Sequence, residues 1–134
     1  MKRQAPGLRK SQERGSATVE AAIIFPVVLL LIFGIIQGAL WFHARHIALG
    51  AAQEGARVAS AEDGGSGEDR AREFITNLTG GTLIRHVIIR ESATTQTATV
   101  TVNGQAPSLI PGVDGLPVSQ TATASVERFT WPGS

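Results

Sequence analysis

An uncharged apolar run occupies much of the first third of the sequence. It extends from Ala21 to Phe42, 22 residues, and a helix needs about 20 apolar residues to cross the hydrocarbon layer of a membrane. The core of a secretory signal peptide is shorter, at about 7–15 residues. The run therefore predicts one membrane-spanning helix, so a membrane is the first partner that the sequence indicates.

Charges on the two sides of the run predict its orientation. Residues 1–15 carry five basic side chains, whereas residues 43–57 carry only Arg45 and Arg57. Basic flanks stay on the cytoplasmic side, and Trp41 at the other end of the run is typical of the outer headgroup level. We therefore expect a cytoplasmic N-terminus and an extracytoplasmic C-terminal part.

A carboxylate stands at the inner edge of the run. Glu20 follows Gly15 by five positions, and an acid close to hydrocarbon needs a partner. If the chain were cut between Gly15 and Ser16, the new α-amino group would lie one helical turn from Glu20, on the same face. From the residues alone, a cut chain with this pairing and an uncut anchor with an acid capping its helix are both open.

Small residues mark two parts of the expected helix. Gly34 and Gly38 have the small-xxx-small spacing that lets two helix backbones approach closely. Further along, alanines together with Gly55 continue at helical spacing, so we expect one helix from about Thr18 to Ser60. This second group suits packing either on another protein's helix or on the chain's own domain.

The remaining residues predict a small α+β domain. A short amphipathic helix is expected at 68–78, and strands at 83–90, 96–102 and 118–129 form an antiparallel sheet. In the second strand, Ala98, Val100 and Val102 fall on one face and threonines on the other. Residues Asn103 to Pro117 are expected to form a long loop.

Composition and motifs argue against several function classes. The net charge of +1 comes without a basic stripe, so we expect no nucleic-acid partner, and the absence of cysteine excludes disulfides and thiolate sites. His43 and His46 have helical spacing but no evident third metal ligand. No nucleophile elbow, P-loop or dinucleotide fingerprint occurs. We expect no enzyme, no cofactor and no metal.

Two segments resemble a known family. The stretch Arg14-Gly15-Ser16-Ala17-Thr18-Val19-Glu20, followed by Ala21 to Pro26, resembles the start of the TadE-like proteins of tight-adherence pili. The stretch Ala51 to Ala59, which contains Glu54-Gly55-Ala56-Arg57, resembles the "EGAR" region on their continued helix. The resemblance covers about residues 14–60.

The resemblance implies a non-catalytic pseudopilin or minor pilin that functions in assembly of a Flp-type pilus. It implies that a prepilin peptidase cuts after Gly15, that Ser16 becomes the N-terminus, and that Glu20 is the acid at position five. We then expect a leader at 1–15, a transmembrane and projecting helix at 16–60, and an extracytoplasmic domain at 61–134.

The same resemblance implies the partners and the location. They are the prepilin peptidase, other pilin-like helices (a major Flp-type pilin and a second pseudopilin) and the membrane platform of pilus assembly. The protein would reside in a bacterial cytoplasmic membrane or in the pilus. The alternative is an uncleaved single-pass anchor that presents a small binding or sensing domain.

Overall fold

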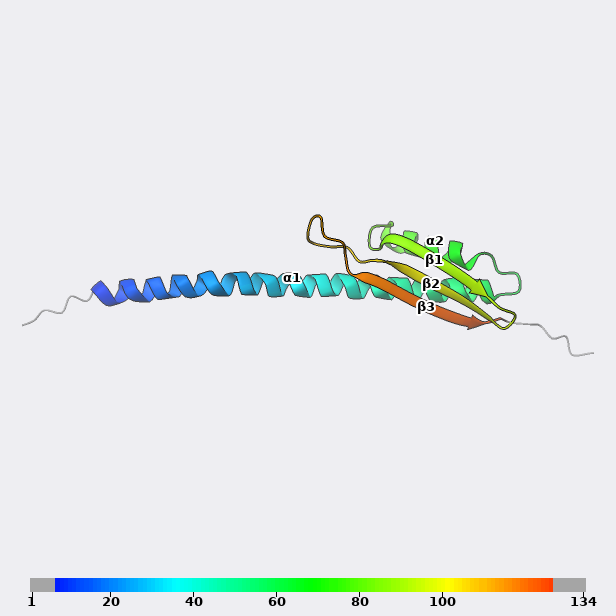
Figure 1. Ribbon diagram of the computed structural model, residues 1–134, viewed down its shortest axis with the longest axis horizontal. Coiled ribbons are helices and arrows are strands. Elements are labelled where there is room, and N and C mark those ends of the chain that lie inside the picture. Colours follow the sequence, from blue (N-terminus) through cyan, green and yellow to red (C-terminus); the bar gives the residue numbers. More distant parts are fainter. Residues whose placement is uncertain (1–6, 127–134) are drawn as a thin grey trace, which may run out of the picture. The chain divides into compact units, whose positions relative to one another are not determined.

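Residues 7–126 fold into two helices followed by a three-stranded sheet, which confirms the predicted α+β class. The computed structural model describes residues 7–126. The elements are α1 (Gly7–Ser60), α2 (Gly67–Thr79), β1 (Arg85–Ala93), β2 (Thr97–Gln105) and β3 (Pro117–Ser125), as Figure 1 shows. The chain divides into two compact units between Ile36 and Gln37, and each unit is described by itself below.

The first unit consists of the N-terminal part of α1. This helix begins at Gly7, earlier than the expected start near Thr18, because the intervening residues include Leu, Lys, Arg, Gln and Glu, all good helix formers. Large apolar side chains from Val19 to Ile36 are exposed in this unit. Helix α1 is long and apolar enough to cross a membrane, as the sequence predicted.

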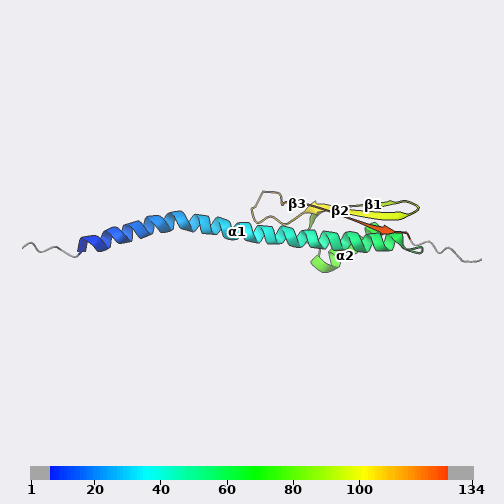
Figure 2. The same ribbon diagram turned by 90° about the horizontal axis from the view of Figure 1, so that it is seen from below.

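The second unit has its core between the outer part of α1, residues 37–60, and the sheet. Small side chains of the outer part of α1 are fully buried, and they share one core with Val100 and Val102 of β2. Figure 2 shows the sheet lying along this part of the helix. Because the residues of α1 that face the core are alanines and not bulky side chains, the helix and the sheet can approach closely. The buried small residues are Ala44, Ala48, Ala51, Ala52 and Ala56.

Helix α2 matches the predicted amphipathic helix and has clear ends. The Ser66 side chain accepts a hydrogen bond from the Asp69 amide at 3.2 Å, which is an N-cap. Gly80 ends the helix in the left-handed conformation at φ 60°, which glycine adopts without strain. Ala71 and Ile75 are buried, whereas Leu78, expected on the same apolar face, is 61% exposed because it lies in the last turn, beyond the core.

The three strands form an antiparallel sheet in the order β1-β2-β3. The predicted face is confirmed, since Ala98, Val100 and Val102 are all buried. On the opposite face, threonine hydroxyls pair across β2 and β3 at 3.0 Å, Thr99 with Thr123 and Thr101 with Thr121. Both helices therefore pack on one face of the sheet, and the two threonine pairs lie on the other.

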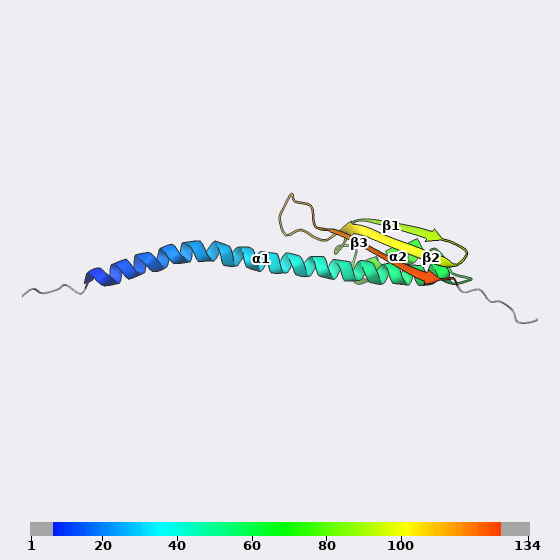
Figure 3. The same cartoon turned by 60° about the horizontal axis from the view of Figure 1, so that its bottom comes forward.

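The expected loop from Asn103 to Pro117 is shorter in the structure. Strand β2 continues to Gln105, because residues 103–105 pair with 117–119 of β3. Gly104 permits this pairing, since an added Cβ would collide with the Ile84 side chain. The connection is thus residues 106–116, which leaves the sheet where β2 ends and β3 begins (Figure 3). Strand β3 ends at Ser125, and residues 127–129 of the predicted strand lie outside the described residues.

Candidate functional site

The predicted processing site lies on an exposed stretch of α1. Residues 13–20 are all exposed, including Gly15, Ser16 and Glu20. An added Cβ at Gly15 would meet no atom within 4 Å, and the Thr18 hydroxyl donates to the Arg14 carbonyl at 2.8 Å. The peptide bond between Gly15 and Ser16 is thus part of a helix with no tertiary packing around it. Residues 1–6 of the predicted leader lie outside the described residues.

Glu20 stands at the N-terminal end of the exposed apolar surface of α1. The four ion pairs found among residues 13–126 all lie in the second unit and do not include Glu20. Its predicted pairing with an α-amino group at Ser16 requires a cut chain, whereas the structure is that of the uncut chain. The role of Glu20 in charge pairing stays a prediction.

Gly34 and Gly38 leave open space on the helix. A Cβ added to either glycine would meet nothing within 4 Å, and both residues are exposed. A second helix could therefore approach the backbone at these positions without displacing a side chain. Contact with another protein at Gly34 and Gly38 stays a prediction.

Gly55, by contrast, packs inside the chain's own domain. A Cβ at this position would lie 2.6 Å from the carbonyl oxygen of Gly67 and 3.2 Å from both the Ala71 Cβ and the Val100 Cγ1. The neighbouring Ala56 is 1% exposed. Of the two alternatives for the small residues beyond Phe42, the structure shows packing on the chain's own domain at these positions.

The two charged residues of the stretch Glu54-Gly55-Ala56-Arg57 form an ion-pair network with α2. Arg57 donates to the two carboxylate oxygens of Glu54 at 2.9 and 3.2 Å. Arg70 of α2 donates to Glu54 Oε1 at 3.1 and 3.2 Å, and also to Glu73 at 3.2 Å. Hydrogen bonds from Arg57 and then from Arg70 hold the pKa of the Glu54 carboxyl below its usual value. The stretch thus joins α1 to α2.

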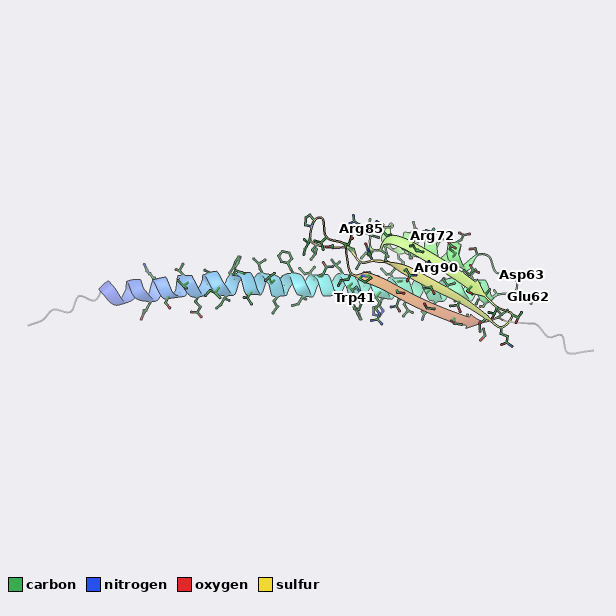
Figure 4. All side chains as sticks on the ribbon, in the orientation of Figure 1. Trp41, Glu62, Asp63, Arg72, Arg85 and Arg90 are labelled. Carbon is green, nitrogen blue, oxygen red and sulfur yellow. The ribbon has the colours of Figure 1, made fainter. Side chains whose placement is uncertain are left out.

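Two side chains near the C-terminal end of the apolar run form hydrogen bonds to the 106–116 connection and its junction with β3. The Gln37 amide donates to the Pro107 carbonyl at 2.9 Å and accepts from the Leu109 amide at 3.1 Å. The Trp41 indole donates to the Pro117 carbonyl at 3.1 Å, and Figure 4 shows Trp41 on α1 close to the start of β3. Sequence reasoning missed this role of Gln37, although a polar residue inside an apolar run is a signal that could have indicated it.

A groove of about 290 Å³ lies next to these residues. Phe42, Arg45, His46, Leu49 and Gln120 line it. The Arg45 guanidinium lies 5.5 Å from the centre of the Trp41 ring, a cation–π arrangement. His46 contacts Phe42 edge to face, with ring centroids 4.3 Å apart. These aromatic and basic side chains are of the kind found at a membrane headgroup level.

The described part of the chain offers no cluster of side chains that could bind a metal ion. Within residues 7–126, no three histidine or acidic side chains come together in a way that could hold a metal ion. His43 and His46 are both exposed. The features with defined geometry are therefore contacts between elements, together with the exposed N-terminal part of α1.

Comparisons with known proteins give one match. The family model described as TadE-like protein matches residues 15–57. A search of curated proteins and a search of solved structures each found no match. The matched segment starts at Gly15, before the predicted cut, and ends at Arg57 in the ion-pair network. Over residues 15–57 this chain is thus similar to the TadE-like family, the family that its sequence predicted.

Proposed function

We propose that this protein is a non-catalytic pseudopilin or minor pilin in assembly of a Flp-type, tight-adherence pilus. The observation that carries the proposal is the family match over residues 15–57. That match contains all three positions to which the processing chemistry is assigned, Gly15, Ser16 and Glu20.

Processing after Gly15 fits the local physics of the site. The bond to be cut is exposed and lies in a helix, and a peptidase needs that helix to open locally. Glycine in a helix interior costs about 0.5–1 kcal/mol relative to alanine, so Gly15 weakens the helix at this bond. The lack of tertiary contacts at Gly15 leaves only helix hydrogen bonds to break.

The cut would change the charge at the membrane edge. It removes five basic residues and Glu13, a net +4, and therefore lowers the net charge of the side chains from +1 to −3. The new ammonium group at Ser16 then lies at the i, i+4 position to Glu20. It can pair with Glu20 of the same chain or with that of a neighbouring helix.

The rest of the molecule suits a role in assembly. The exposed apolar side chains of α1 between Val19 and Ile36 can contact lipid or similar helices, and Gly34 and Gly38 offer close approach. The alanines from Ala44 to Ala56 named above are buried in the core that α1 shares with the sheet, so they are not free to contact other helices. We therefore assign contacts with a major pilin or a second pseudopilin to residues before Gln37 and to Gly38.

The test is the N-terminal mass of the protein recovered from its native host, in membrane and in sheared surface fractions. We expect a chain that begins at Ser16. A Gly15→Leu variant should stay uncut, while the matched control Gly7→Leu, a glycine replacement within the leader, should be processed normally. If the protein in every fraction still begins at Met1 or Lys2, it is instead an uncleaved anchor.

A further inference from the structure

The connection between β2 and β3 is an ordered loop whose ends are hydrogen-bonded to each other and whose surface is apolar. Its ends are joined by the Ala106 amide, which donates to the Leu116 carbonyl at 2.9 Å. We call residues 106–116 the apolar loop, because its four largest side chains are all apolar and exposed. Their exposed fractions are 41% for Leu109, 61% for Ile110, 53% for Val113 and 49% for Leu116.

The tip of the apolar loop is a tight turn. The Val113 amide donates to the Ile110 carbonyl at 3.2 Å, with Pro111 and Gly112 between them and Gly112 at φ 79°. Proline followed by glycine with this φ fits a type II turn. Exposed apolar side chains on an ordered turn require a physical explanation, since water penalises them.

The apolar loop is tied to the part of α1 that belongs to the membrane run. Gln37, which holds Pro107 and Leu109, lies five residues before the end of the uncharged run at Phe42, about 7.5 Å along the helix. Trp41, which holds Pro117, lies one turn further out. From its base at Trp41 to its contact with Gln37, the loop thus runs toward the membrane.

Three backbone amides around the tip of the apolar loop have partners within the protein. Polar backbone groups in lipid must find partners within the protein. The amides of Leu109, Ile110 and Val113 donate to Gln37, to the Ser108 hydroxyl and to the Ile110 carbonyl, respectively. Pro107 and Pro111 have no N–H to satisfy, and residues 105–113 carry no charge.

We infer that the apolar loop inserts into the outer leaflet of the membrane beside α1, where Gln37 holds it in place. Leu109, Ile110 and Val113 enter the lipid at the boundary between headgroups and acyl chains. Asp114, the only charged residue of the loop, marks the limit of insertion at the headgroups. This makes a second membrane contact beside the spanning helix. The inference rests on the membrane span alone, so its failure would leave the proposed function untouched.

The chain contains no cysteine, so single labels can be placed without altering the background. The full chain with Ile110→Cys carries an environment-sensitive fluorophore in vesicles of phosphatidylethanolamine and phosphatidylglycerol, at a high ratio of lipid to protein. Thr95→Cys, in the exposed turn between β1 and β2, is the matched control. Lipids with a quencher on the upper acyl chain report contact with lipid, and iodide reports contact with water.

We expect the lipid quencher to act several-fold more strongly at position 110 than at position 95, and iodide to show the reverse order. Equal iodide access at the two positions would overturn the inference. Protection from both quenchers at position 110 would also overturn it, because the loop would then be covered by protein.

The role of Gln37 is tested in the same vesicles. Gln37→Leu keeps the helix apolar and removes both hydrogen bonds to the loop, so lipid quenching at position 110 should fall. Gln53→Leu replaces an exposed glutamine on the same helix and should leave the quenching unchanged. Unchanged quenching in Gln37→Leu would overturn the assignment of Gln37 as the residue that holds the loop.

Discussion

Gly55 of α1 and Gly67 at the start of α2 are in direct backbone contact. A Cβ on Gly55 would lie 2.6 Å from the Gly67 carbonyl oxygen, and a Cβ on Gly67 would lie 2.9 Å from the Cβ of Ala59. Neither neighbour is the end of a flexible side chain, so neither can move aside easily. The two glycines therefore set the distance between the helices and the position of α2 over β2.

Replacing Gly55 with alanine tests this contact. Overpacking against backbone costs about 1–3 kcal/mol, while the gain in helix propensity offsets up to about 1 kcal/mol. We expect a net loss of up to about 2 kcal/mol and a lower melting temperature, measured by circular dichroism of the full chain in detergent micelles. Gly65→Ala is the control, because a Cβ there meets nothing within 4 Å. A Gly55→Ala variant as stable as Gly65→Ala would contradict the packing described.

The Glu54 network predicts a loss of stability in acid. The arginines lower the pKa of Glu54, so the folded chain binds this proton less readily than the unfolded chain does. The stabilisation is therefore present above the usual carboxyl pKa of about 4.3 and is lost as the pH falls through the lower pKa of the folded state.

The Glu54→Gln variant measures this contribution. The variant should melt at a lower temperature than the wild type at pH 7, and the difference should shrink toward pH 3. Glu62→Gln, at an exposed acid just beyond α1, should behave like the wild type at both pH values. A constant difference between Glu54→Gln and the wild type across this pH range would show that the charge of Glu54 contributes nothing.

Glu20→Ala separates assembly from membrane insertion. The apolar run is unchanged, so we expect normal amounts in the membrane fraction, but the Ser16 ammonium loses its partner and less protein should reach the sheared surface fraction. Glu13→Ala removes an acid that the proposed cut after Gly15 would remove in any case, so it should have no effect. Wild-type amounts of Glu20→Ala in the surface fraction would argue against charge pairing, even if processing at Gly15 occurs.

Local sequence patterns were sufficient to predict the elements and their faces. The uncharged run from Ala21 to Phe42 specifies an exposed apolar helix by length alone. Alternation in Thr97 to Val102 specifies which face of β2 is buried, because successive side chains in a strand point to opposite sides. The glycine-rich stretch after Ser60 ends α1 as expected. The apolar run predicts a start of α1 near Thr18, whereas the helix begins at Gly7, because the residues before the run are themselves good helix formers.

Relationships between distant residues were decided only by the tertiary structure. Nothing local to Gly55 shows that it faces Gly67 and not another protein, and nothing near Glu54 indicates Arg70, 16 residues away. The contact of Gln37 with Pro107 spans 70 positions. Periodicity reports which face of an element is apolar, because that depends on the spacing of neighbours along the chain. Which element packs on that face depends on how helix and sheet come together, and this is decided only when the whole second unit folds around its core.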